Sequence, residues 1–217
     1  MRYCSLLLVL AATLFTWGCQ TVYYDTMERM GIHKREILVD RVEEAQESQE
    51  VAKEQFADAL EAFRATVTVK SSKLIDTYKK LQKEYNNSVM RANDVRGRIA
   101  AVKNVAEALF EEWESELNEF SSDNLRNASA TQLKTTRREY ETLVKAMEKA
   151  ESKMDPILIV FNDQVLFLKH NLNARAIASI QDEVTTMEAE VANLITDMNL
   201  AIAEAEAFVK QLKVEEE

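Results

Sequence analysis

The sequence predicts an all-α protein, an elongated antiparallel bundle of about four long, coiled-coil-like helices. Three glycines and one proline occur in 217 residues, whereas average usage would supply about fifteen glycines and about ten prolines. Charged residues make up 29% of the chain, and its many Ala, Glu, Lys, Leu and Arg residues are typical of long helices and coiled coils. Apolar residues also recur in alternating steps of three and four, the spacing of a heptad seam.

The first helix is expected to begin at about residue 33. Its seam has one polar position, Gln49, and otherwise consists of Leu38, Val42, Ala45, Ala52, Phe56, Ala59, Phe63 and Val67. A β-branched run and two serines follow in residues 66–72, a composition that disfavours a helix interior and favours an N-cap. The chain is therefore expected to reverse there.

The second helix is expected over about residues 72–120, which would make it roughly 70 Å long at 1.5 Å per residue. Its seam has Ser88 as the one polar position and otherwise consists of Leu74, Tyr78, Leu81, Tyr85, Ala92, Val95, Ile99, Val102, Ala106, Leu109 and Trp113. Residues 121–129 are polar and rich in turn-forming types, so they are predicted to form a loop.

The third helix is expected to begin near Ala130 and to reach Pro156. Proline removes one backbone donor and disfavours helical geometry at Asp155, so a kink or a short break is predicted there. Residues 157–168 are apolar on nearly all sides. This segment is too short to span a membrane and is predicted to be buried on most sides.

The last helix has a seam with strict three-four spacing, made of Ile177, Ile180, Val184, Met187, Val191, Leu194, Met198, Ala201, Ala205, Phe208 and Leu212. The chain reverses before it at one of two places. A turn at residues 171–173 gives the last three helices similar lengths of about 40 to 50 residues, whereas a turn at Pro156 makes the last helix nearly 60 residues long. Length matching favours the first.

The N-terminus has the pattern of an export signal. Arg2 is followed by an apolar run and then by Gly18, a small residue at the expected cleavage point. The run is shorter than the roughly 20 residues that a permanent membrane helix needs, so cleavage is expected. Cys19 comes next, and with Gly18 it resembles the lipobox of bacterial lipoproteins, in which the cysteine sulfur is acylated and becomes the new N-terminus.

The lipobox resemblance predicts lipidation of Cys19. Lipoboxes usually have Leu and then a small residue before the last small position, where this chain has Thr16 and Trp17. Gln20 follows the cysteine in place of the aspartate that retains enterobacterial lipoproteins at the inner membrane. By that resemblance, the destination is the periplasmic face of the outer membrane.

The expected organisation has four parts. Residues 1–18 form the signal peptide, 19–32 a lipid-anchored tether with a short helix, 33–214 the helical bundle domain, and 215–217 an acidic tail. The chain has two cysteines, Cys4 and Cys19. Because Cys4 precedes the cleavage point, the mature chain is not expected to contain a disulfide.

The formal net charge of −10 makes nucleic acid an unexpected partner. The basic pairs Lys34-Arg35, Lys79-Lys80 and Arg137-Arg138 are isolated among carboxylates, and they are interpreted as solvated helix faces. An anionic membrane would repel so acidic a body, so acyl chains on the N-terminus would have to hold the protein there.

Several segments resemble a family of exported, mostly helical proteins of Gram-negative bacteria, called domain of unknown function 2959. The similar segments are residues 34–42, 106–113, 154–158 and 163–178, of which the last is long and unusual in composition. The resemblance implies location and shape, and it assigns no catalytic residues.

No known catalytic or metal-binding pattern is present. A carboxylate-bridged dimetal bundle needs Glu-x-x-His on two helices, but His33 is preceded at that spacing by Met30, and His170 by Phe167. The mature chain offers no cysteine nucleophile other than the lipidation candidate and no glycine-rich phosphate loop. We therefore expect no enzyme activity, cofactor or metal.

One polar cluster has two interpretations, and it consists of Asp163, Lys169, His170, Asn171, Asn173 and Arg175. These residues either cap helix ends and satisfy one another at a turn, or form a partner-docking tip beside the apolar segment. The former is favoured.

The leading functional expectation is a non-enzymatic, lipid-anchored periplasmic scaffold or interaction protein of the envelope, which binds the membrane through its acyl chains and also binds a protein partner. The alternative is a periplasmic chaperone-like or envelope-stress sensor module with a groove between helices. Heptad seams can be satisfied within one chain or between chains, so the sequence leaves a homo-oligomer open.

Overall fold

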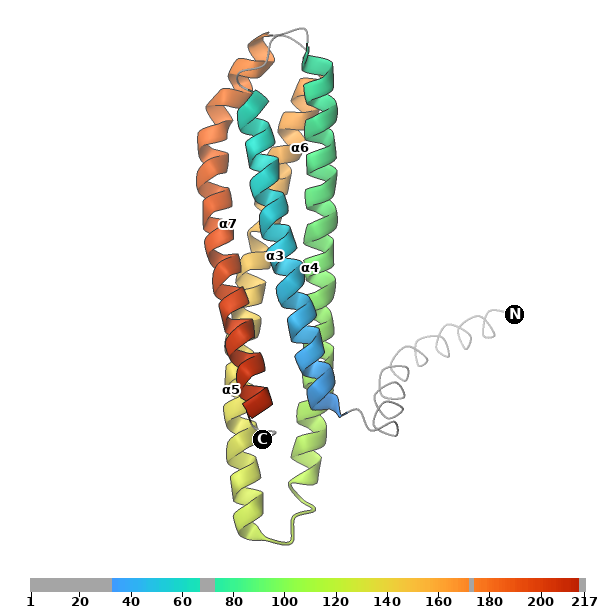
Figure 1. Ribbon diagram of the computed structural model, residues 1–217, viewed down its shortest axis with the longest axis vertical. Helices are drawn as coiled ribbons and strands as arrows, with labels where there is room; N and C mark the ends of the chain where they lie inside the picture. Colours follow the sequence, from blue (N-terminus) through green and yellow to red (C-terminus); the bar gives the residue numbers. More distant parts are fainter. Residues whose placement is uncertain (1–32, 67–72, 172–173, 215–217) are drawn as a thin grey trace, which may run out of the picture.

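The computed structural model describes residues 33–66, 73–171 and 174–214, and for residues 174–179 and 182 it describes the backbone alone. This part of the chain is helical, without strands (Figure 1). The helices are α3 (Lys34–Thr66), α4 (Leu74–Glu116), α5 (Asp123–Ser152), α6 (Met154–His170) and α7 (Ala174–Val214). The all-α prediction is confirmed.

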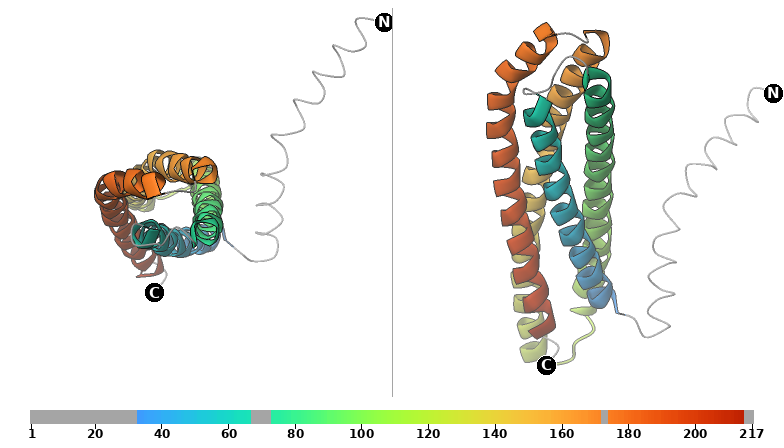
Figure 2. Two further views of the ribbon diagram at one scale, coloured as in Figure 1. Left: turned by 90° about the horizontal axis from the view of Figure 1, so that it is seen from above. Right: turned by 45° about the horizontal axis from the view of Figure 1, so that its top comes forward.

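The helices form an up-and-down bundle. α5 and α6 follow one another along one rod, so the five helices make four rods around a common core (Figure 2). The rod of α5 and α6 lies opposite α3, and both pack against α4 and α7. We call the end where α3 begins and α7 ends the base, and the other end the distal end. The α4–α5 connection projects beyond the base (Figure 1).

The predicted seams form the core. The seven apolar seam residues of α3 that the structure describes are at most 1% exposed, and they run from Leu38 to Phe63. The seam of α7 is equally well buried between Met187 and Ala205. Tyr78, Tyr85 and Trp113 of the α4 seam are half-buried and pack against the core. Burial of these apolar stripes is the main stabilising contribution in a bundle of this kind.

The reversal before the last helix lies where length matching places it. α6 ends at His170 and α7 begins at Ala174, and the two helices run in opposite directions. α4, the α5–α6 rod and α7 therefore have similar lengths, since α4 has 43 residues and α7 has 41. The predicted signal peptide, the tether, the turn residues 67–72 and the acidic tail lie outside the described residues.

The predicted loop over residues 121–129 is wrong for most of its length. α5 begins at Asp123 and not near Ala130. The Ser122 hydroxyl caps it by accepting a hydrogen bond from the amide of Leu125 at 3.4 Å, and Arg126 pairs with Asp123 at 3.0 Å. The start of α5 projects beyond the end of α4, so its first turn has no helix beside it (Figure 1). A helix without neighbours needs no apolar seam, so its polar sequence resembles a loop.

Gln49 is the polar position in the α3 seam, and it is fully buried. Neither its amide nitrogen nor its amide oxygen has a hydrogen-bond partner among the described residues. A buried polar group without a partner costs free energy of desolvation.

We expect Gln49→Leu to raise the free energy of unfolding by about 1 kcal/mol, measured by urea denaturation. Gln55→Leu is the control, because the side chain of Gln55 donates to Glu84 at 2.9 Å and its loss should not stabilise the bundle. An unchanged or lower stability of Gln49→Leu would show that its amide is satisfied in solution.

No helix in the described ranges combines the length and the apolar character needed to cross a membrane.

Candidate interaction surface

α6 is apolar on two sides, and only one of them faces the core. Its inner side carries Ile157, Phe161 and Leu168, which are at most 1% exposed. On the opposite side Ile159 is 61% exposed and Leu166 is 44% exposed. The prediction that this segment is buried on most sides is therefore only partly correct. A helix at the edge of a four-rod bundle has neighbours on its inner side alone, so outward apolar residues stay in contact with solvent.

The exposed residues share one face because of helix geometry. Positions separated by four, seven, eight and eleven residues lie on one side of an α-helix. We call this side the α6 outer face, and it consists of Ile159, Asp163, Leu166, Phe167 and His170. Phe167 is 37% exposed, whereas Asp163 and His170 are exposed polar residues between and beyond the apolar ones.

The structure divides the polar cluster that the sequence indicated. Asp163 and His170 lie on the α6 outer face, and Lys169 is exposed about 100° away around the helix. Asn171 caps the helix: its side-chain amide donates to the carbonyl of Phe167 at 3.0 Å. Asn173 lies outside the described residues, and Arg175 lies in α7 with its side chain undescribed. Capping therefore accounts for Asn171 but not for Asp163 or His170.

A break between α5 and α6 sets the direction of the α6 outer face. The helix is interrupted at Lys153, whose amide donates to the carbonyl of Ala150 at 3.2 Å in a tighter turn. Pro156 has no N–H to offer the carbonyl of Ser152, so the α-helical hydrogen bond between them is missing. The predicted break is confirmed, but it lies at Lys153, so Asp155 and Pro156 are themselves within α6. It occurs without a reversal of the chain.

Two ion clusters hold the break from both neighbouring helices. On the α4 side, Arg96 pairs with Glu151 at 3.0 Å and with Asp155 at 2.6 Å. Burial lowers the pKa of Arg96, but hydrogen bonds to Asp155 and Glu151 outweigh that effect and raise the pKa above its ordinary value. One guanidinium thus links the last turn of α5 to the first turn of α6.

On the α7 side, the buried carboxylate of Asp197 pairs with Lys149 at 3.0 Å and also with Lys153, the residue at the break. The hydrogen bond from Lys153 lowers the pKa of Asp197, against the opposing effect of burial, and the bond from Lys149 adds to the lowering. Asp197 therefore remains ionised at neutral pH. It ties α7 to the last turn of α5 and to the residue at the break.

The sequence did not indicate the apolar residues of the α6 outer face as functional. One feature of the sequence could have indicated them: the apolar residues of this helix leave no side fully polar. Such a helix is expected to have packing partners on every side. The described ranges contain no group of three or more His, Cys, Asp or Glu side chains that could hold a metal ion.

Comparison with known proteins gives a family and nothing finer. The model of a family described as protein of unknown function (DUF2959) matches residues 23–212. The chain therefore belongs to that family, and the resemblance in the four segments is confirmed. Neither the curated proteins nor the solved structures include a match to the chain.

Proposed function

We propose that this member of the DUF2959 family is a non-enzymatic, lipid-anchored docking protein of the bacterial envelope. Acyl chains on Cys19 hold it on the periplasmic face of the outer membrane, and the α6 outer face binds a partner protein. The exposed apolar side of α6 carries this proposal, because Ile159 and Leu166 are large hydrophobic residues left in contact with solvent on one face.

The position of this face suits an anchored spacer. The chain from Cys19 enters the described bundle at His33, directly before the start of α3 at the base, whereas α6 ends at the distal end (Figure 1). α3 has 33 residues, which corresponds to about 50 Å of helix. A bundle anchored by its N-terminus can therefore present the α6 outer face well away from the bilayer.

The shape and charge of the face fit an amphipathic helix of a partner. α6 has 17 residues, a contact about 25 Å long and one helix wide. Its apolar positions repeat at the spacing that helix pairs use to interdigitate. Asp163 offers a carboxylate beside Leu166, and Lys169 offers a cation near the helix end. A partner helix with a basic residue facing Asp163 and an acidic residue facing Lys169 would complement this pattern.

The groove between α3 and α4 does not support a chaperone-like role. It encloses about 600 Å³ and is lined by Glu44, Glu47, Arg91, Asp94 and Arg98 among others. Arg98 pairs with Glu44 across it. Charged walls of this kind do not suit the apolar segments of unfolded chains.

The anchor is tested by Cys19→Ala. Wild type is expected to take up radioactive palmitate in growing cells and to fractionate with the outer membrane, because several acyl chains hold a protein stably on a bilayer. Cys19→Ala is expected to take up none and to appear in the soluble periplasmic fraction or as uncleaved precursor. Equal labelling and equal fractionation of the two proteins would contradict the lipid anchor.

The docking face is tested by a photo-crosslinking amino acid at position 166, with position 200 as the matched control. Leu166 and Leu200 are 44% and 46% exposed, but only Leu166 lies on α6. We expect one crosslinked species of defined size from position 166, lost when Ile159→Lys is added, and no such species from position 200. A crosslinked product at twice the mass of the chain would show that the α6 outer face binds a second copy of this chain and would contradict a separate partner protein. Equal products from both positions would contradict a specific docking face.

A further inference from the structure

The first half of α5 is basic within an acidic protein. Residues 124–138 contain Arg126, Lys134, Arg137 and Arg138 and no Asp or Glu, although the whole chain has a net charge of −10. The sequence interpretation treats Arg137-Arg138 as a pair isolated among carboxylates. The fold gives it a different setting, because Lys134 and Arg138 are four residues apart and lie on one side of α5.

These cations line a groove at the base, which we call the basal groove. It encloses about 500 Å³, and Thr131, Lys134, Thr135 and Arg138 are among its lining residues. Lys134 and Arg138 are exposed, and neither has an ion pair within the described part of the chain. The Thr131 hydroxyl donates to the carbonyl of Asn127 at 2.8 Å, so the groove offers a ligand two uncommitted cations and the hydroxyl group of Thr135.

Two carboxylates also face the basal groove, Glu114 from α4 and Glu141 from α5. Glu114 is engaged by Arg137 at 2.7 Å, and the Arg137 guanidinium also lies 5.0 Å from the centre of the Phe110 ring. Glu141 is exposed one turn beyond Arg138. The lining residues thus carry one more positive than negative charge, in contrast to the acidic protein as a whole.

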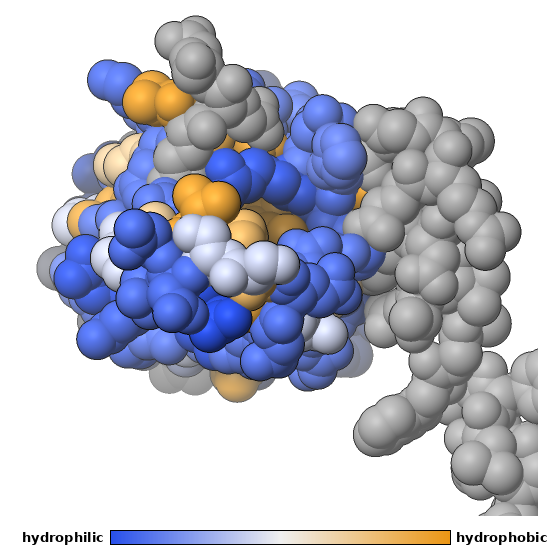
Figure 3. Space-filling view, turned by 90° about the horizontal axis from the view of Figure 1, so that it is seen from below, coloured by the Kyte–Doolittle hydropathy of each residue, from blue (hydrophilic) through white to orange (hydrophobic). Residues whose placement is uncertain are grey.

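The basal groove lies at the end where the anchored chain enters the bundle. Lys34, the first residue of α3, pairs with Glu112 of α4 at 3.1 Å. Arg137 pairs with Glu114, which places Arg137 level with the start of α3. Lys134 lies about 4.5 Å beyond that level, toward the α4–α5 connection. Seen from below, this end of the molecule is mostly hydrophilic (Figure 3).

We infer that the basal groove binds the phosphate groups of anionic phospholipids in the membrane that carries the acyl anchor, and so seats the base of the bundle on the bilayer. This inference rests on the proposed anchor. Lys134 and Arg138 supply the charge, and the Thr135 hydroxyl donates a hydrogen bond to a phosphate oxygen. Two cations bind an anionic surface weakly. A tether of residues 20–32 converts this contact into an intramolecular one with a high effective concentration.

The chain supplies its own coupling point and its own fluorescent reporter for the test. From residue 19 onward Cys19 is the one cysteine and Trp113 the one tryptophan. Trp113 lies at the base, and its indole N–H donates to the Ser129 hydroxyl at 2.7 Å, which joins it to α5. The chain from Cys19 onward can be coupled through its thiol to maleimide lipid in vesicles, without cellular acylation. Energy transfer from Trp113 to dansyl lipid then reports how close the base lies to the bilayer.

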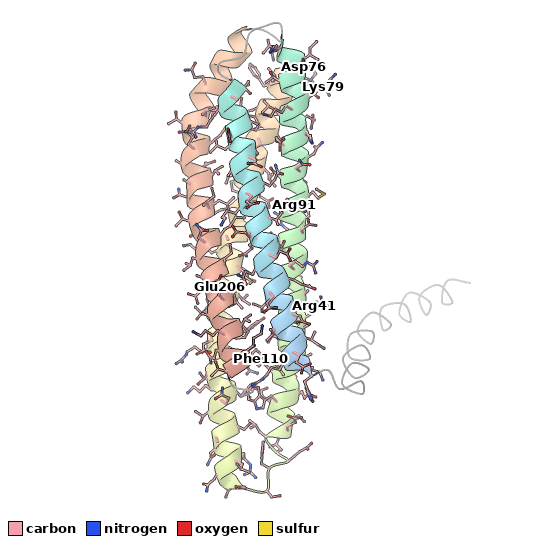
Figure 4. All side chains as sticks on the ribbon, viewed as in Figure 1. Arg41, Asp76, Lys79, Arg91, Phe110 and Glu206 are labelled. Carbon is pink, nitrogen blue, oxygen red and sulfur yellow. The ribbon has the colours of Figure 1, made fainter. Side chains whose placement is uncertain are left out.

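Transfer is expected to be higher in vesicles of phosphatidylcholine with 30% phosphatidylglycerol, a composition chosen for the test, than in pure phosphatidylcholine, and to fall to the lower level in 0.5 M NaCl. K134E/R138E is expected to reduce the docked-to-undocked ratio by at least about 30-fold in the anionic vesicles. The matched control K79E/K80E reverses two exposed lysines at the distal end, where Figure 4 labels Lys79, and should transfer as wild type does.

Equal transfer in the two kinds of vesicle, or equal transfer for wild type and K134E/R138E with matching thermal unfolding, would overturn the inference. Loss of the signal in inorganic phosphate, but not in chloride of equal ionic strength, would assign the groove to free phosphate and would also overturn it. Because coupling through maleimide replaces acylation, this outcome is independent of the palmitate-labelling result. A failure of phospholipid binding by the basal groove can therefore be distinguished from a failure of the lipid anchor.

Discussion

Replacing Phe161 with alanine is expected to lower the free energy of unfolding by about 3 to 5 kcal/mol. The ring is fully buried on the inner side of α6 and stacks on Phe63 of α3, with ring centroids 4.8 Å apart and planes 23° apart. Phe56 packs beside it at 6.3 Å. These contacts join α6 to the rod diagonally opposite, so the alanine variant loses both the transfer free energy of the ring and the packing around the space it leaves.

Urea denaturation followed by circular dichroism measures this loss. Phe167→Ala is the matched control, since it removes the same side chain from the same helix at a position that is 37% exposed. The control is expected to lose less than about 1.5 kcal/mol, because a half-exposed ring gains less from folding. Equal losses in the two variants would contradict the assignment of inner and outer sides of α6.

The rods and their seams could be predicted from the sequence because heptad spacing acts locally. The positions of Leu38, Val42 and Phe56 relative to one another already define a helix face, and burial of that face follows from the hydrophobic effect. The break at Lys153, three residues before Pro156, is equally local, since proline lacks an N–H whatever surrounds it. Comparing helix lengths was enough to place the last reversal.

The start of α5 shows where local composition fails. Residues 123–129 look like a loop because they are rich in Ser, Asp and Asn, yet they are helical. The same residue types that favour turns also favour helix caps and exposed first turns. Only the projection of the α4–α5 connection beyond the base explains why this helix needs no apolar face.

The α6 outer face could not be predicted because it depends on the order of packing around the bundle. Ile157 and Ile159 are chemically identical residues of one apolar segment, but Ile157 is 1% exposed and Ile159 is 61% exposed. Periodicity cannot separate them when apolar residues surround the helix. The basal groove was missed for a related reason, since adjacent Arg137 and Arg138 suggest a pair, whereas the helix brings Lys134 and Arg138 together.

Asp197→Asn is expected to lower the free energy of unfolding by about 1 to 2 kcal/mol at pH 7. The Asp197 side chain is buried, and it binds Lys149 and Lys153 across the break in the α5–α6 rod. Asparagine keeps the shape and loses the charge, so both charge-assisted contacts weaken. The loss is moderate because both lysines are partly exposed and can return to water.

The effect of Asp197→Asn is also expected to depend on pH. Lys153 and Lys149 hold the pKa of Asp197 below its ordinary value of 3.8, so the folded state favours the ionised carboxyl more than the unfolded state does. The stabilisation is therefore fully present above the unfolded-state pKa and is lost as the pH falls through the lower folded-state pKa. Wild type and Asp197→Asn should have different stabilities at pH 7, and the difference should shrink steadily below about pH 4.

Denaturation at a series of pH values, with Asp163→Asn as the control, measures this convergence. Asp163 is an exposed aspartate of α6 that has no ion pair within the described ranges, so its asparagine variant should follow wild type at every pH. The comparison between variants cancels the titration of all other carboxylates, which acts on each protein alike. A stability difference for Asp197→Asn that persists undiminished at pH 3 would contradict the role of the ionised carboxylate, because only shape and packing would then distinguish the two side chains.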